Sequence, residues 1–304
     1  MSMNKTPHVH GAFCAAPERM SRRDFLPRLG TCLVIGPLAV GGILWLEARV
    51  LCIAAATVML VVFNEWLIVS GIKARSAHRG VIALGGGLMA ILASAPVEVL
   101  GGLAGAGALA WMGAPLWLAR PNLGRTANGC STAMKVGLGL LIVLSAFSAF
   151  HWLLDRYNGR HLILYILAVV CVLDSTAYLV GRYSNGFTAA RLIAPNASPN
   201  KNYGVLVCAI LASALAASLG AALLYPKLGP ERALFFGLGM MAAASGVVGD
   251  LTSSLLKRHA GRKDSGSILP GHGGALDRLD SLVAALPVFA VALCLAFPAG
   301  EVSP

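Results

Sequence analysis

The chain has 304 residues, of which 57% are hydrophobic and 12% charged, and its mean hydropathy is +0.74. Soluble domains carry roughly 25% charged residues, so this composition excludes an ordinary soluble globular protein. The formal net charge of +11 would indicate a nucleic-acid partner in a soluble protein, and its placement along the chain decides what it means here.

Apolar stretches of about 18 residues or more recur along the sequence, and each can cross a bilayer as a helix. We therefore predict an all-α polytopic membrane protein with about nine transmembrane helices. The expected spans are 29–47, 49–71, 80–97, 99–119, 133–154, 161–181, 203–225, 232–256 and 281–299. This pattern divides the chain into a polar tail (1–28), N-terminal scaffold helices (29–154) and a C-terminal catalytic region (155–304).

The basic residues are distributed very unevenly around these spans. If the connecting segments alternate between the two sides, one side receives 19 of the 24 lysines and arginines and the other side five. The positive-inside rule makes the richer side cytoplasmic and places the N-terminus there. Much of the net charge thus reflects topology, and nucleic acid is not expected as a partner.

Four glycines in the fourth expected span fall at the spacing that lets transmembrane helices approach closely: Gly101, Gly102, Gly105 and Gly107. Two interpretations stay open. The glycines pack against other helices of the same chain, or they form the interface of a homodimer.

Three carboxylates, Glu65, Asp174 and Asp250, lie inside apolar spans, where a charge costs at least ~2.5 kcal/mol unless a partner or cavity receives it. Tyr178 and Arg182 follow Asp174 at i+4 and i+8, so the three side chains share one helical face. This face leads from a buried carboxylate to a cation at the cytoplasmic end.

Asp250 repeats this pattern, because Ser254, Lys257 and Arg258 follow it at i+4, i+7 and i+8. A divalent metal held by the carboxylates and phosphates held by the cations would use this arrangement. An interhelical ion pair with arginines that extend to the interface is the structural alternative.

The segment 263–280 concentrates further chemistry. Three glycines at 271, 273 and 274 surround His272, and such a backbone can direct several N–H groups at an anion. Asp277 and Asp280 lie at i and i+3 where the last span begins, a spacing that suits a divalent metal. Asp264 either joins this site or balances the neighbouring cations.

These motifs together resemble the hallmark of the phosphatidate cytidylyltransferases, also called CDP-diacylglycerol synthases. The match covers 27 positions at the family's spacing, from Ser254 through Lys257-Arg258, Lys263-Asp264 and Leu269-Pro270-Gly271-His272-Gly273-Gly274 to Asp277-Arg278-Leu279-Asp280. Asp174–Tyr178 and Ser198–Lys201 also resemble family segments. The chain departs from the pattern at Ala275 and at Asn202, which replaces a threonine in a loop one residue shorter, and the latter bears on nucleotide or lipid preference.

The resemblance implies that CTP and phosphatidate, or a related lipid phosphate, react to give CDP-diacylglycerol and pyrophosphate with Mg²⁺; a second cation is left open. It implies metal ligands at Asp250, Asp277 and Asp280. Catalytic roles fall to Lys257, Arg258, Lys263, Asp264 and His272. Substrate contacts fall to Asp174, Ser175, Tyr178, Arg182, Ser198, Lys201, Ser254, Gly273, Gly274 and Arg278. We expect a multi-pass protein of the bacterial inner membrane with its active site facing the cytoplasm.

Two other functions are compatible with the sequence. A CTP-dependent lipid kinase, similar to the polyprenol and phytol kinases, would transfer the γ-phosphoryl group and release CDP. An ion-coupled transporter would use Asp174 and Asp250 as a relay, but it leaves the segment 263–280 unexplained. A CDP-alcohol phosphotransferase is not indicated, because its D-G-x-x-A-R pattern is absent.

Overall fold

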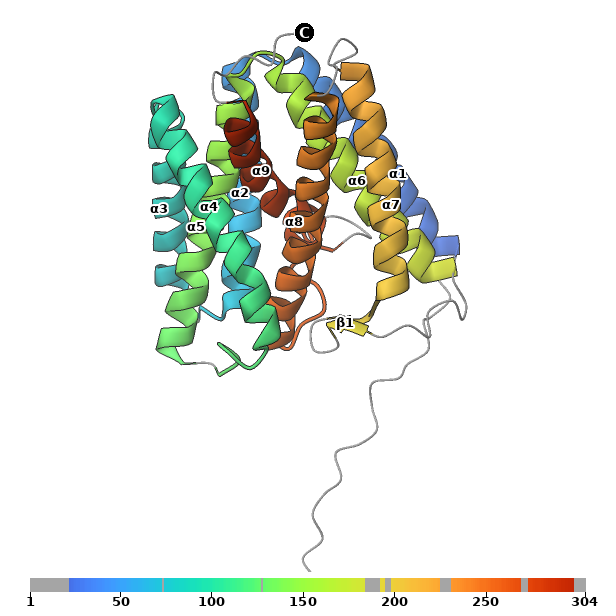
Figure 1. Ribbon diagram of the computed structural model, residues 1–304. Coiled ribbons are helices and arrows are strands. Elements are labelled where there is room, and N and C mark those ends of the chain that lie inside the picture. The colour runs from blue at the N-terminus through green and yellow to red at the C-terminus, as the bar shows by residue number, and fades with distance from the viewer. Residues whose placement is uncertain are drawn as a thin grey trace, which may run out of the picture.

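The computed structural model describes residues 22–72, 74–126, 128–183, 192–194, 198–224, 231–268 and 273–297, with the side chains of 22–33, 192–202 and 231 left aside. This part of the chain forms nine helices, which run side by side as a bundle (Figure 1). They are α1 (Arg22–Trp45), α2 (Ala48–Ser70), α3 (Arg75–Leu92), α4 (Val97–Ala119), α5 (Gly129–Leu154), α6 (Gly159–Tyr183), α7 (Tyr203–Leu224), α8 (Glu231–His259) and α9 (Leu276–Ala296).

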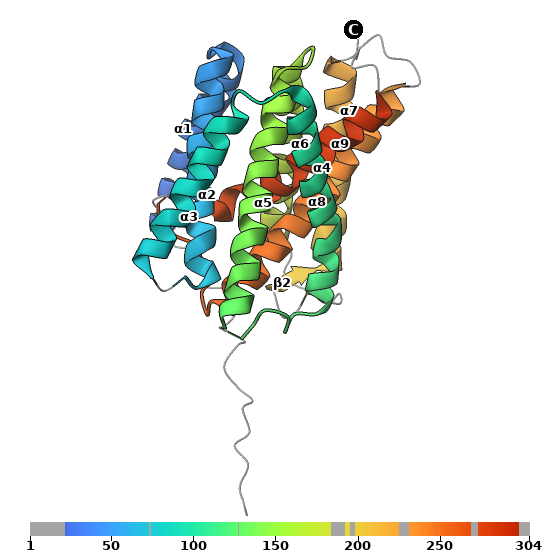
Figure 2. The same ribbon diagram turned by 90° about the vertical axis from the view of Figure 1, so that its left-hand side faces the viewer.

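Successive helices run in alternating directions, so α2, α4, α6 and α8 all finish at the lower end of the bundle in Figure 1. We call this the site end. In the perpendicular view, α9 runs obliquely across the bundle, whereas the other helices run nearly parallel to one another (Figure 2). Its first residue, Leu276, is 2% exposed, so this helix begins in a buried position.

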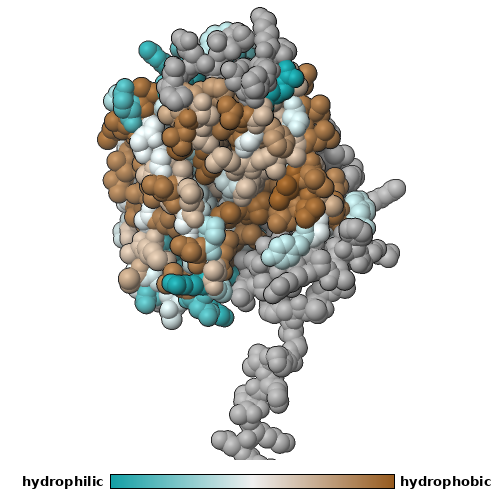
Figure 3. All heavy atoms as spheres, in the orientation of Figure 1, coloured by the Kyte–Doolittle hydropathy of each residue, from teal (hydrophilic) through white to brown (hydrophobic). Residues whose placement is uncertain are grey.

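The outside of the bundle carries a broad apolar band with hydrophilic residues at its two ends (Figure 3). Large apolar side chains point outward at helical spacing, for example Leu109, Met112 and Leu116 of α4. Seven of the described helices are long and apolar enough to cross a membrane, namely α2 and α4 to α9. The prediction of a multi-pass helical membrane protein is therefore confirmed.

The finer prediction of nine spans is not confirmed by this criterion. The first turns of α3 contain Arg75, His78 and Arg79, which lower the mean hydropathy of this helix. Among the residues whose side chains are described, α1 provides only the shorter apolar stretch Val34–Trp45. α1 also begins at Arg22, ahead of the expected start at residue 29. The location of the N-terminus stays a prediction.

The all-α class needs one addition in the polar segment before α7. Strands β1 (Leu192–Ala194) and β2 (Ser198–Asn202) pair in antiparallel fashion, with Leu192 opposite Asn202 and Ala194 opposite Ser198. Backbone N–H and C=O groups outside helices need partners, and pairing of the two extended segments supplies them. The loop that carries Ser198 and Lys201 thus contains a strand pair that leads directly into α7.

The four closely spaced glycines singled out in α4, at 101, 102, 105 and 107, divide into two pairs. Gly107 lies against Ser145 of α5, where a Cβ would overlap the serine side chain, and Gly101 lies against the indole of Trp152. Gly102 and Gly105 face open space. Packing within the chain is therefore confirmed for Gly101 and Gly107, and the homodimer stays a prediction.

We expect Gly107→Ala to lower the free energy of unfolding by about 1–3 kcal/mol, because the added methyl forces α4 and α5 apart at the fully buried Ser145. Gly105→Ala on the same helix is the matched control and should leave stability unchanged or slightly higher. Thermal unfolding in detergent, followed by circular dichroism, compares the two. Equal melting temperatures would contradict this account of the α4–α5 contact.

Candidate active site

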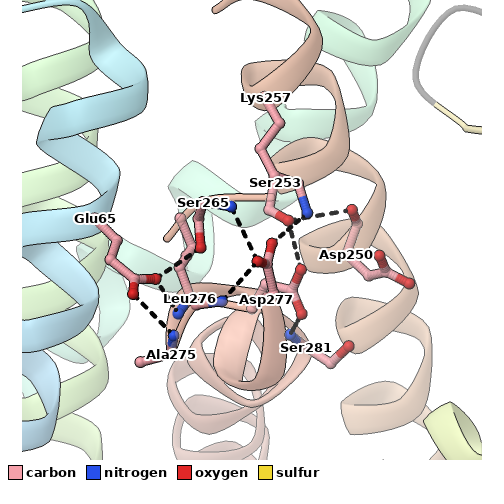
Figure 4. Close-up of polar contacts among 11 residues, drawn as sticks. Glu65, Asp250, Ser253, Lys257, Ser265, Ala275, Leu276, Asp277 and Ser281 are labelled. Atoms are coloured by element: carbon pink, nitrogen blue, oxygen red, sulfur yellow. Dashed lines mark hydrogen bonds and ion pairs between the residues drawn. The ribbon is translucent and has the colours of Figure 1, made fainter. Parts of the chain in front are cut away.

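Four parts of the chain meet near the site end: α2, the last turns of α8, the segment 260–275 and the start of α9. Figure 4 shows the side chains of Glu65, Lys257 and Asp277 converging on this segment from different elements. Residues 269–272, and with them the predicted catalytic His272, lie outside the described residues. The geometry below therefore rests on 260–268 and 273–277.

Asp277, in the first turn of α9, is bonded on both carboxylate oxygens. Its Oδ1 lies 2.6 Å from Nζ of Lys257, and the two side chains are only 10% and 11% exposed. Its Oδ2 accepts hydrogen bonds from the backbone N–H groups of Ser265, at 2.9 Å, and Gly274, at 3.0 Å. Asp277 thus joins α8, α9 and both arms of the connecting segment (Figure 4).

Glu65 of α2 is a buried carboxylate, 1% exposed, without an ion pair among the described residues. Its Oε1 accepts from the N–H of Ala275 at 3.0 Å, and its Oε2 accepts from the N–H of Leu276 at 2.9 Å and the hydroxyl of Ser265 at 2.6 Å. The first N–H groups of a helix have no intrahelical partner and carry partial positive charge. Glu65, which lies on α2 far away in the sequence, therefore caps the N-terminus of α9.

The glycines of the segment allow the backbone to approach these carboxylates. A Cβ on Gly266 or Gly274 would overlap the Glu65 carboxylate, and Gly273 has a positive φ of 83° beside Asp277. Glycine has no Cβ, so it permits the close backbone approach at Gly266 and Gly274 and the positive φ at Gly273. The N–H groups of Ser265, Gly274 and Ala275 thus point at two carboxylates of the protein itself, which the sequence alone had not indicated.

A second set of hydrogen bonds connects three helices beside this centre. The hydroxyl of Ser253 in α8 donates a hydrogen bond to Asp280 in α9. Ser281, the next residue of α9, donates its N–H to Asp280 at 2.9 Å and its hydroxyl to Asp174 of α6 at 3.0 Å. Asp174 and Asp280, two of the predicted site residues, therefore belong to one connected network.

The predicted metal ligands Asp250, Asp277 and Asp280 come from adjacent turns of α8 and α9, but they do not form one cluster. Figure 4 shows the carboxylate of Asp250 pointing away from that of Asp277. Within the described ranges, no group of three or more His, Cys, Asp or Glu residues could hold a metal ion. A metal at this position stays a prediction.

The remaining predicted residues are less buried. Arg258, Lys263, Asp264, Arg278, Ser175, Tyr178 and Arg182 are exposed, Ser254 is partly buried, and Ser198 and Lys201 lie on β2. Arg182 donates to the Tyr178 hydroxyl at 3.2 Å, as expected for residues on one helical face. Apart from Lys257, the described cations among the predicted site residues whose burial is given, Arg182, Arg258, Lys263 and Arg278, are therefore exposed.

Sequence reasoning assigned no role to Glu65, Ser253, Ser265 or Ser281. A carboxylate inside the apolar helix α2 was the available signal for Glu65, since such a group needs donors. The serines gave no signal, because a buried serine more commonly bonds to the carbonyl of its own helix. Their partners are assembled from helices that lie far apart in the sequence.

Comparison with known proteins identifies a family over most of the chain: residues 27–296 match the cytidylyltransferase family. The chain is 34% identical to a phosphatidate cytidylyltransferase of Pseudomonas aeruginosa over 282 residues, which cover 88% of this chain and 96% of the relative. It is 38% identical to that of Haemophilus influenzae over 141 residues, and 36% identical to that of Staphylococcus aureus over 138 residues. The latter two alignments cover 46% and 45% of this chain and about half of each relative, 48% and 51%.

We expect Glu65→Gln to lower the free energy of unfolding by about 1–3 kcal/mol, because the amide would turn its NH₂ group toward at least one of the three donors that now face the carboxylate. Trypsin should then cleave faster at the exposed Arg262 and Lys263, since the segment loses its attachment to α2. Thermal unfolding and mass spectrometry of the first fragments measure both effects.

Glu98→Gln is the matched control, because Glu98 is also a carboxylate beside a helix N-terminus, in the first turn of α4, but it is exposed. It should change stability by less than about 0.5 kcal/mol. If the two variants behave alike, Glu65 does not hold the start of α9.

Proposed function

This chain belongs to the cytidylyltransferase family, and we propose from this premise that it transfers the cytidylyl group of CTP to phosphatidate, giving CDP-diacylglycerol and pyrophosphate. The observation that carries the proposal is the buried Lys257–Asp277 pair, which the N–H groups of Ser265 and Gly274 hold at the start of α9. The relatives named above support the identity of both substrates.

The reaction requires no nucleophile from the protein. A phosphate oxygen of the lipid forms a bond to the α-phosphorus of CTP, and the bond from that phosphorus to the β-phosphate oxygen breaks in line, releasing pyrophosphate. The protein must hold two polyanions together and offset their charge. Lys257 directs one N–H to Asp277, and its other N–H groups are the donors we assign to phosphate oxygens.

The exposed cations Arg258, Lys263 and Arg278 lie at the same end and would attract the nucleotide from water. The lipid reaches the site from the side of the bundle, since its acyl chains stay in the bilayer. Catalysis on this proposal consists of positioning plus electrostatic stabilisation.

The donor chemistry at the site fits Mg²⁺, which would offset phosphate charge when bound. Carboxylate oxygens are the ligands that Mg²⁺ prefers, and it is usually held by one or two carboxylates together with substrate phosphates. A cluster of three protein ligands is therefore not required. Asp250 and Asp277 are the residues that would hold the ion, with Asp280 and Asp174 behind them.

We also propose that all nine helices cross the membrane, with the N-terminus and the site end on the cytoplasmic side of a bacterial inner membrane. The unequal distribution of lysine and arginine supports this orientation. CTP then arrives from the compartment that the exposed cations face. A homodimer stays a prediction, with the open positions Gly102 and Gly105 as its candidate surface.

We expect Asp277→Asn to lower turnover by about a hundredfold or more, because Lys257 loses its counter-charge and the site loses a carboxylate. The assay uses purified protein in micelles with phosphatidate, Mg²⁺ and CTP labelled at the α-phosphate, and it follows label in the lipid and released pyrophosphate. Asp155→Asn is the control, since Asp155 is an exposed carboxylate whose side chain is 53% accessible.

Near-wild-type activity of the folded Asp277→Asn protein would contradict the assignment of this site. If that variant does not fold, Lys257→Met replaces it in the same assay. Parallel reactions with CTP labelled at the γ-phosphate test the reaction itself, because label in the lipid and release of CDP would identify a kinase instead.

A further inference from the structure

Ser265 is the one buried residue in the stretch 261–268 that follows α8. It is 0% exposed, whereas Gly266 is partly buried and the other residues of the stretch are exposed. A serine side chain has little apolar surface, and a hydroxyl taken out of water costs free energy unless a hydrogen bond replaces its hydration. Specific hydrogen bonds, rather than the hydrophobic effect, therefore hold Ser265 inside.

These hydrogen bonds run to two carboxylates from different helices. The hydroxyl of Ser265 donates to Oε2 of Glu65 in α2 at 2.6 Å, although the two residues lie 200 positions apart. Its backbone N–H donates to Oδ2 of Asp277 in α9 at 2.9 Å. Figure 4 shows Ser265 between these two side chains, with a dashed line to each.

Among the donors described at this centre, only Ser265 reaches both carboxylates. Gly274 and Lys257 donate to Asp277, whereas the N–H groups of Ala275 and Leu276 donate to Glu65. The connection from α2 to the Lys257–Asp277 pair therefore passes through one residue whose side chain and backbone donate to different partners.

Packing holds the Ser265 hydroxyl in this direction. A Cβ on Gly274 would overlap both the hydroxyl of Ser265 and the carboxylate of Glu65, so the backbone of Gly274 lies directly against their hydrogen bond. Since the side chain of Ser265 is fully buried, bulk water does not compete for the hydroxyl. The attachment to Glu65 thus also fixes where the backbone N–H of Ser265 points.

The direction of this N–H decides how Asp277 faces Lys257. The N–H groups of Ser265 and Gly274 occupy Oδ2 of Asp277, and its Oδ1 lies 2.6 Å from Nζ of Lys257. If the carboxylate turned, the ammonium would move with it. A misplacement of about 1 Å can lower the rate of an enzymatic reaction about a hundredfold.

We propose that Ser265 is a positioning residue for cytidylyl transfer: it bonds to Glu65 and Asp277 together and thereby sets the direction of the Lys257 ammonium. This inference rests on the proposed function. Ser265 acts on the reaction through Asp277 and Lys257 rather than on a substrate. In a purely structural role, Ser265 would attach the segment to α2 and affect stability, but neither Lys257 nor turnover of the folded protein.

The first test is turnover of Ser265→Ala, which removes the hydroxyl and keeps the backbone N–H. In the assay with α-labelled CTP, we expect kcat of the folded protein to fall about tenfold or more, with KM for CTP changed less than about twofold. The double variant with Glu65→Gln should match Glu65→Gln alone, because both changes break the same connection.

Ser213→Ala is the matched control for this substitution. Ser213 of α7 is also 0% exposed, but its hydroxyl donates to the carbonyl of Ala209 in its own helix at 2.9 Å. This variant should keep the wild-type kcat.

The second test follows Lys257 itself and needs no turnover. Reductive methylation with formaldehyde and a borohydride, read by peptide mass spectrometry, gives the rate at Lys257 relative to the exposed Lys263. We expect Ser265→Ala to raise this ratio about threefold or more, because the bond to Asp277 protects the amine, and Ser213→Ala to leave it unchanged. If the wild-type protein forms no CDP-diacylglycerol, the proposed function fails, and the ratio still decides whether Ser265 positions Lys257.

In active enzyme, a wild-type kcat or a wild-type methylation ratio for folded Ser265→Ala overturns the proposal, even if its melting temperature is lower. Should Ser265→Ala not fold, Ser265→Cys replaces it, because a thiol nearly keeps the volume but is a weak donor. A lower kcat together with a higher ratio in that variant supports the positioning role, and wild-type values of both overturn it.

Discussion

The carboxylate of Glu65 is the interaction on which the site depends. It is almost fully buried in an apolar helix, and the described structure balances it with one hydroxyl and the first N–H groups of α9 rather than with a cation. A helix N-terminus carries about half a positive elementary charge, which makes it a suitable partner for a carboxylate in a medium of low dielectric constant. The position of α9, and hence of Asp277 in its first turn, follows from this contact.

Asp277, positioned by the start of α9, in turn positions the end of α8 through Lys257. Its ion pair with Lys257 fixes the ammonium, while its bonds to Ser265 and Gly274 fix both arms of the connecting segment. Buried carboxylates thus build the frame, and exposed cations such as Arg258 and Lys263 face water. A frame assembled before substrate arrives stabilises developing charge without reorganisation at the moment of reaction.

Close packing in the membrane makes this frame possible. Gly139 lies directly against the ring of Trp66, whose indole donates to Lys135, so the residue next to Glu65 anchors α2 on α5. Gly249 of α8 lies against the backbone of Asp280 in the same manner. Without a hydrophobic driving force between helices in lipid, such contacts of small residues and interhelical hydrogen bonds hold a bundle together.

The sequence by itself determined the helical membrane class, the approximate position of each helix and the family, and it predicted Lys257 and Asp277 as site residues. These properties follow from local hydropathy and from a motif of contiguous residues. Only the tertiary structure decided that Glu65 caps α9 and that Ser281 connects Asp174 to Asp280. The reason is physical: a buried polar group is satisfied by whichever donors packing brings to it, and the donors to Asp174 and Glu65 described above come from residues 107 to 211 positions away. The hairpin before α7 likewise depends on pairing between two segments, neither of which has a strand pattern of its own.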